Sequence, residues 1–219
     1  MKWCLNFSNP YNVQMATKHD EPMKELDDSA AKMENNPTPE NVDKEFHLRL
    51  LEERDTEELF SLLTANYDYL KKWLPFPNNA FQLSDAKAYI NDGRKQYLTY
   101  AGVPFGIFLQ SKLVGFISYR KADWANRIIG LGYWIDSSRQ GRGLATKACR
   151  ILTDFAFDGL RMNRVEIACA TENIKSRAVA ERLGFCREGI IREAEYVNGR
   201  YVDHVVYGIL AREWADSAR

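Results

Sequence analysis

The sequence predicts a single folded domain of the mixed α/β class. Three observations lead to this fold class. Strand-like alternation recurs along the chain after residue 45, several segments repeat apolar residues at helical spacing, and the chain ends in two strand-like stretches around Asn198-Gly199. We therefore expect the order β-α-α-β-β-β-α-β-α-β-β, without an internal repeat.

Residues 1–44 differ in composition from the rest of the chain. They contain no Arg and have five Lys against eight Asp and Glu, and Pro22, Pro37 and Pro39 interrupt a polar run. Such a segment offers too little apolar surface to offset the entropy of folding. We expect a flexible acidic extension over residues 1–44 and one folded domain over residues 45–219.

The folded domain is expected to begin with a strand and two helices. Phe46 to Leu51 alternates like a strand, and Asp55 with Glu58 resembles a capping box that opens a helix. Residues 67–77 combine aromatic side chains with proline, which predicts a structured turn. A second helix is expected to start at Ser84.

The remaining elements are punctuated by polar or glycine-containing turns. The stretch from Gly141 to Gly159 has the clearest helical rhythm, with one apolar face. Asn198-Gly199 is the strongest short-range signal for a two-residue hairpin turn. In chain order we expect a hairpin from residues 103–109 and 113–119, a strand over 128–135, a helix over 141–159, a strand over 164–170, a helix over 176–183 and a final hairpin.

Composition and charge exclude several functional classes. Thirty Lys and Arg balance thirty Asp and Glu, so the chain has no net field to attract nucleic acid or an anionic membrane. No stretch approaches the roughly 20 apolar residues of a spanning helix. The first ten residues lack a secretory signal, the four cysteines form no C-x-x-C pair, and the three histidines form no H-E-x-x-H. We expect a cytoplasmic protein with no metal site and no nucleic-acid or membrane partner.

The most informative feature is a candidate anion-binding turn. A strand here enters a helix through a turn that holds Gly141 and Gly143, so backbone N–H groups can converge beside the positive end of the helix. Arg139, Arg142 and Lys147 add positive charge, which suits a pyrophosphate. The pattern lacks the signature of a P-loop and the third small residue of a dinucleotide fingerprint. The alternative is that the glycines only permit a tight turn.

Two motifs make the chain similar to a known family. Gln140-Gly-Arg-Gly143-Leu-Ala145 matches the pyrophosphate loop [QR]-x-x-G-x-[GA], and a second motif runs from Asn173 to Phe185, after the next strand. In these motifs the chain resembles the GNAT superfamily of acetyl-CoA-dependent N-acetyltransferases. The resemblance covers about residues 45–215. Shorter matches are similar to the branch that acetylates the N-termini of ribosomal proteins, and they begin at Leu70, Gly132 and Glu195.

The resemblance implies a fold and a cosubstrate site. It implies a mixed central sheet, flanked by helices, whose two central parallel strands (128–135 and 164–170) splay apart at their C-terminal ends to admit acetyl-CoA. Asn173 would contact the pantetheine arm, and the compatible alternative is a cap on the following helix. The residues that the family's motifs assign to acetyl-CoA are Ile135, Arg139, Gln140, Gly141, Arg142, Gly143, Leu144, Ala145, Thr146 and Asn173.

The resemblance also implies catalytic residues. Many family members have a Tyr at the position of Ala180 to protonate the departing thiolate, whereas the ribosomal-protein branch resembles this chain in having a serine at Ser176. Ser176 is therefore the candidate acid, and Glu195 is the candidate base that takes a proton from the amine. Glu193 is the substitute base, expected on the same strand face as Glu195. The alternatives are an exposed first-turn serine and a solvated hairpin charge.

The acceptor is expected to be a primary amine that attacks directly in a ternary complex. The branch indicates a protein N-terminus, with Trp73 and Phe76 shaping the amine pocket, and the alternative role for both side chains is core packing. Two other functions stay open. These are acetylation of a small amine such as a polyamine, amino acid or antibiotic, and acetyl-CoA binding without transfer. A homodimer is compatible with each of them.

Overall fold

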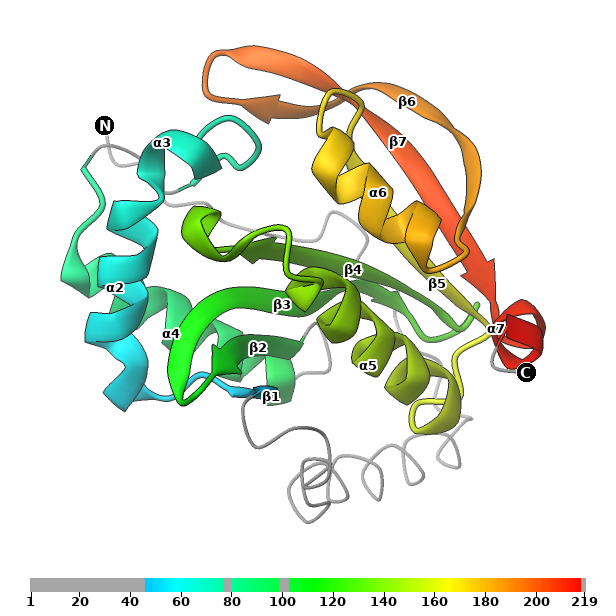
Figure 1. Cartoon of the computed structure of the whole chain (residues 1–219), viewed down its shortest axis with the longest axis horizontal. Helices are drawn as coiled ribbons and strands as arrows, with labels where there is room; N and C mark the ends of the chain where they lie inside the picture. The colour runs from blue at the N-terminus through cyan, green and yellow to red at the C-terminus, as the bar shows by residue number, and fades with distance from the viewer. Residues whose placement is uncertain (1–45, 77–79, 99–102, 218–219) are drawn as a thin grey trace, which may run out of the picture. The chain divides into compact units, whose positions relative to one another are not determined.

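Over the residues that the structure describes, the architecture is a twisted seven-stranded sheet with helices on both faces (Figure 1). The computed structural model describes residues 46–76, 80–98 and 103–217, so the extension expected over residues 1–44 lies outside the described residues. The strand order is β1-β2-β3-β4-β5-β7-β6. The strands are β1 Phe46–Leu50, β2 Val103–Leu109, β3 Lys112–Asp123, β4 Ile128–Ile135, β5 Arg164–Ala170, β6 Cys186–Val197 and β7 Arg200–Leu210.

Two hydrophobic clusters bury the two faces of the sheet. Ile117 belongs to the larger cluster, with α5 and α6, and the preceding Phe116 belongs to the smaller one, with α2 and α4. Consecutive residues of a strand point to opposite faces, so the helix pairs lie on opposite sides. Figure 1 shows α2 and α4 beside β1–β3, and α5 and α6 beside β4, β5 and β7. The helices are α2 Thr56–Ala65, α3 Tyr67–Leu70, α4 Leu83–Leu98, α5 Leu144–Asp158, α6 Ile174–Arg182 and α7 Ala211–Ser217.

The central parallel pair separates part-way along its length, which confirms the expected splay. β4 and β5 pair from Ile128 with Arg164 as far as Leu131 with Ile167. Beyond that point β4 stays paired with β3, and β5 stays paired with β7. All other neighbouring strands are antiparallel. The sheet therefore opens between β4 and β5 at their C-terminal ends while each half keeps its outer hydrogen bonds.

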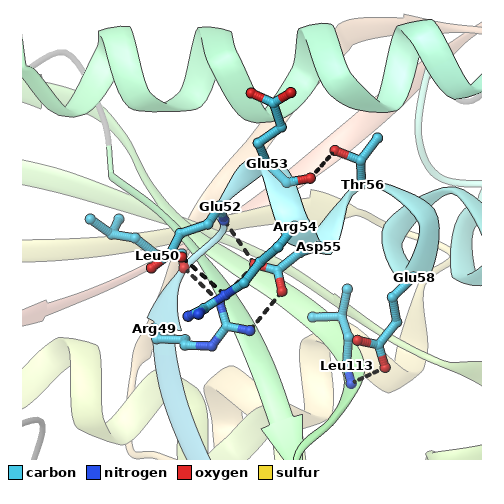
Figure 2. A network of polar contacts seen from close by, with 9 residues as sticks. All are labelled: Arg49, Leu50, Glu52, Glu53, Arg54, Asp55, Thr56, Glu58 and Leu113. Carbon is cyan, nitrogen blue, oxygen red and sulfur yellow. Dashed lines mark hydrogen bonds and ion pairs between the residues drawn. The ribbon is translucent and has the colours of Figure 1, made fainter.

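The start of α2 is fixed differently from the sequence prediction (Figure 2). The Asp55 carboxylate accepts hydrogen bonds from Arg49 Nη1 at 2.6 Å, from Arg49 Nη2 at 2.7 Å and from the Glu52 N–H at 2.8 Å. Glu58 instead accepts from the Leu113 N–H at 2.9 Å. The predicted Asp55–Glu58 capping box is wrong because the bidentate ion pair with Arg49 draws Asp55 back toward β1. Burial acts to raise the pKa of Asp55, but the Arg49 guanidinium and the Glu52 N–H hold it below its ordinary value.

Several remaining predictions are confirmed and others need adjustment. The final hairpin turns at Asn198-Gly199, both with positive φ, but its strands are longer than expected. The turn expected over residues 67–77 contains the short helix α3.

Within the described ranges no helix is long and apolar enough to cross a membrane, and no three His, Cys, Asp or Glu side chains are grouped to hold a metal ion.

Candidate active site

The loop between β4 and α5 forms an open cradle of backbone. Gly141 and Gly143 have φ of +74° and +75°, a region that favours glycine, and a Cβ at either position would meet no atom within 4 Å. The entry to the loop is anchored because Asn66 accepts from the Ser137 N–H at 2.8 Å and donates to Asp136 at 3.2 Å. Gly143 is the N-cap of α5, so the first N–H groups of that helix border the cradle.

A cavity of about 1020 Å³ extends from this cradle through the opening between β4 and β5. Six cationic side chains line it, which makes the cavity a local anion site in a chain of zero net charge. They are Arg120, Arg139, Lys147, Arg150, Lys175 and Arg182. Of the residues assigned from sequence, the cavity brings together Trp73, Ile135, Arg139, Gln140, Gly141, Gly143, Leu144, Ala145, Thr146, Asn173, Ser176 and Glu195.

Two of the residues expected at the site do not line this cavity. The Arg142 side chain is exposed on the loop. Phe76 packs in the smaller hydrophobic cluster, with its ring centroid 5.2 Å from that of Tyr89. For Phe76, core packing is therefore the role that the contacts favour, whereas Trp73 does reach the cavity.

The first turn of α6 brings a hydroxyl pair to the cavity. Asn173 caps the helix by accepting from the Ser176 N–H at 3.2 Å. Tyr133 Oη donates to the Ser176 carbonyl oxygen at 2.9 Å, and Ser176 Oγ lies 3.0 Å from Tyr133 Oη. Burial raises the pKa of the Tyr133 hydroxyl well above its ordinary value, so it stays protonated. Sequence reasoning missed Tyr133, although strand alternation places it on the same face as Ile135.

Glu195 reaches the cavity from the last hairpin, together with a residue that the sequence did not single out. His204 of β7 lines the same cavity, and its Nε2 lies 3.4 Å from Glu195 Oε2. The prediction that Glu193 shares a face with Glu195 is wrong. Glu193 has φ of +49° within a register shift of β6, and its side chain is exposed. The bulge breaks the strand alternation on which that prediction depended.

The hairpin tip is fastened to the turn after α3. Asn198 Nδ2 donates to the carbonyl oxygens of Lys71 at 2.7 Å and Leu74 at 3.0 Å. Tyr69 and Trp73, from the same region, line the cavity, as do Glu195 and His204. Two separate parts of the chain are thus tied together beside the Glu195 end of the cavity.

A comparison with known families matches residues 45–186 to the model described as the acetyltransferase (GNAT) domain. The chain belongs to the GNAT acetyltransferase family. The acetyltransferase is 43% identical over 177 residues to the Bacillus subtilis protein named "Putative ribosomal N-acetyltransferase YdaF", covering 79% of this chain and 95% of that protein. The predicted resemblance to the ribosomal-protein branch is confirmed.

Two solved structures show the same fold with a ligand of the expected class. The microcin C7 self-immunity acetyltransferase MccE, in complex with acetyl-CoA and AMP, is 28% identical, with a TM-score of 0.74 over 80% of this chain and 97% of that one. The ribosomal L7/L12 alpha-N-protein acetyltransferase RimL, in complex with coenzyme A, is 28% identical, with a TM-score of 0.72 over 77% of this chain and 96% of that one.

The geometry and the charge of the cradle in this acetyltransferase also fit a cosubstrate such as acetyl-CoA. The loop glycines leave open space where a side chain would otherwise stand, and cationic side chains line the same cavity. Backbone N–H groups at a helix N-terminus with flanking cations bind phosphate groups well. The opening between β4 and β5 then gives an extended ligand a path away from the phosphates.

Proposed function

We propose that this acetyltransferase moves the acetyl group of acetyl-CoA to the N-terminal amino group of a ribosomal protein. The observation that carries the proposal is that one cavity is lined both by the phosphate cradle and by Glu195, and that it runs through the opening of the sheet. The similarity to a relative named for ribosomal N-acetylation and to RimL supports the choice of acceptor. Both reactants would meet inside one cavity, so no covalent enzyme intermediate is required.

The residues that would hold acetyl-CoA lie in the loop and at the first turn of α6. The N–H groups from Gly141 to Thr146 would bind the pyrophosphate, with Arg139 and Lys147 beside it. Asn173 uses its side-chain oxygen to cap α6, which leaves its Nδ2 group to donate to the pantetheine arm. Acetyl-CoA, when bound, supplies the acetyl group as an activated thioester.

Ser176 is proposed to stabilise the leaving sulfur. Ala180 is fully buried and has no proton to give, so the family's commoner acid is absent at that position. The Ser176 hydroxyl needs only to rotate away from Tyr133 Oη, 3.0 Å away, to donate to a thiolate instead. Tyr133 keeps Ser176 in place through its bond to the serine carbonyl oxygen. The buried Tyr133 hydroxyl thus helps to fix the position of Ser176, the proposed acid.

Glu195 is proposed to remove the proton that the acceptor amine must lose. An α-amino group has an ordinary pKa of about 7.7 to 8.0, so much of it is protonated at neutral pH and cannot attack. Glu195 is half-buried at the cavity wall, where a carboxylate can accept that proton. A positioned base of this kind contributes roughly 10² to 10⁴ in rate.

The walls beside Glu195 favour the end of a chain as the acceptor. Because Asn198 ties the hairpin to the turn at residues 71–74, the two walls are joined rather than open along their length. A free N-terminus can enter such a site end-on. A lysine amine stands at the end of a four-carbon side chain, so the lysine backbone would stay outside and could not contact these walls.

The acceptor class can be tested by measuring thiol release from acetyl-CoA with three sets of acceptors. These are peptides with a free N-terminus, the same peptides blocked at the N-terminus but carrying a lysine, and small amines such as polyamines. The proposal predicts turnover with the first set only. Turnover that favours small amines would replace the ribosomal acceptor with a metabolite, and binding of acetyl-CoA without turnover on any set would make the chain a sensor.

A further inference from the structure

Glu195 shares its end of the cavity with an imidazole. His204 lies on β7 opposite Ala170, the last residue of β5, so it stands where the sheet has opened. The side chains of His204 and Glu195 are 18% and 27% exposed, and 3.4 Å separates His204 Nε2 from Glu195 Oε2. Both side chains line the cavity.

A bulge in β6 brings the two side chains together. Ile191 pairs with His204, and Glu195 pairs with Val202, so three residues of β6 stand opposite Asp203 alone. The bulge is held by the Glu193 N–H, which donates to Asp203 Oδ1 at 2.8 Å. Bulges of this kind re-aim side chains next to active sites. Here the result is a carboxylate directed at the imidazole of the neighbouring strand.

Three other charged side chains near this end of the sheet make hydrogen bonds of their own, and Arg192 and Glu193 in the β6 bulge are exposed. Asp203 accepts from the Glu193 N–H, and Glu172, beyond the end of β5, accepts from Arg200 at 3.2 Å. Lys175 of α6 donates to Gln140 at 2.9 Å. On the adjacent strands, Ala170 and Ile191 stand opposite His204 and carry no charge. Glu195 is therefore the acid whose contact with His204 the geometry defines.

We propose that His204 is a positioning residue that contacts Glu195 through an unprotonated Nε2 and takes up the proton which Glu195 removes from the acceptor amine. This inference rests on the proposed role of Glu195. In the step, an N–H bond of the acceptor ammonium breaks and an O–H bond forms on Glu195. That O–H bond then breaks as an N–H bond forms on His204 Nε2, and the imidazolium releases its proton to solvent. The lone pair left on the amine is free to attack.

The pairing has a clear chemical advantage over an isolated carboxylate. The ordinary pKa is about 4.3 for glutamate and about 6.5 for histidine, whereas the α-amino group titrates near 8. A lone carboxylate is a weak acceptor for a proton from such an amine. An ordinary imidazole lies closer to the amine in basicity, so it is a better destination for the proton that the carboxylate removes.

The decisive experiment compares kcat as a function of pH for the parent, His204→Gln, Glu195→Gln and the double variant, with one peptide at saturating concentration. His204→Gln should lower kcat at neutral pH by at least about tenfold and move the acid limb to lower pH, since a carboxylate then acts alone. The double variant should be no slower than Glu195→Gln, because the residues act as one unit. His47→Gln, on β1 and stacked on Phe108, is the matched control and should keep the parent profile.

Each result separates this inference from the proposed function. If Glu195→Gln keeps full activity, the assignment of the base fails. If Glu195→Gln is slow but His204→Gln keeps the parent rate and acid limb, only the role of His204 is overturned. An NMR spectrum of the folded protein gives a readout that needs no turnover. The imidazole resonances of His204 should move in Glu195→Gln, and unchanged resonances would contradict the pairing.

Discussion

Replacing Gly143 with alanine should weaken acetyl-CoA binding far more than it weakens the fold. Gly143 has φ of +75° and ψ of 2°, so an alanine there costs about 1 to 2 kcal/mol in backbone strain. Its Cβ would meet no protein atom within 4 Å and would project into the open cradle. Displacing one hydrogen bond to a charged phosphate costs about 1.5 to 3 kcal/mol, which corresponds to a Kd raised by roughly tenfold to a hundredfold.

Gly184 offers a matched control for the strain. It has φ of +81° and equally open surroundings, but it follows α6 and does not line the cavity. Gly184→Ala should lose a similar free energy of unfolding and keep the parent affinity. Isothermal calorimetry with acetyl-CoA and thermal unfolding of both variants make the comparison. Equal acetyl-CoA affinity for Gly143→Ala and Gly184→Ala would show that the loop does not carry the phosphates.

Four further outcomes follow from the same contacts. Ser176→Ala should lower single-turnover rate by about tenfold or more and leave the acetyl-CoA Kd unchanged, and an unchanged rate would mean that the thiolate leaves without this donor. Asn198→Gly keeps a residue suited to positive φ but loses two hydrogen bonds to the turn at residues 71–74. This variant should therefore have a higher KM for the peptide and an unchanged affinity for acetyl-CoA. An unchanged peptide KM would show that the hairpin does not take part in acceptor binding. Because the folded pKa of Asp55 lies below its unfolded value of about 4, its ionised form stabilises the fold above about pH 4, and this stability is lost as pH falls through the lowered pKa. Asp55→Asn should lack that acid-dependent loss in denaturant titrations, and a parent-like pH dependence would contradict the role of the Arg49 pair. Residues 45–219 alone should keep the melting temperature and turnover of the full chain, and a melting temperature many degrees lower would show that the first 44 residues stabilise the domain.

The elements with strong local patterns could be predicted from the sequence. The structure places β4 and β5 over the predicted ranges 128–135 and 164–170, because β4 is an apolar run bounded by polar turns and β5 alternates polar and apolar residues. The helix α7 had no such local signal. Its position depends on Trp214, which packs near Phe157 and Phe185 and donates to Asp154 at 2.6 Å. These partners lie far away in sequence, so tertiary contact decides the element.

The residues of the site also divide into those that a local sequence pattern predicts and those that depend on tertiary contacts. The cradle is contiguous in sequence, and its glycines have a direct conformational meaning, so it could be found from the motif. Tyr133 and His204 required the register of the sheet, which places one beside Ser176 and the other beside Glu195. Glu193 was misplaced because the bulge in β6 cannot be deduced from a short polar stretch.

The most direct test of the acetyl transfer is to locate the acetyl group on a peptide that carries both a free α-amine and an internal lysine. The peptide would correspond to the N-terminus of a ribosomal protein, and fragmentation mass spectrometry after incubation with acetyl-CoA and the full chain would assign the modified nitrogen. The proposal predicts acetylation of the α-amine, lost in Glu195→Gln. Acetylation of the lysine, or no acetylation while acetyl-CoA is bound, would contradict it.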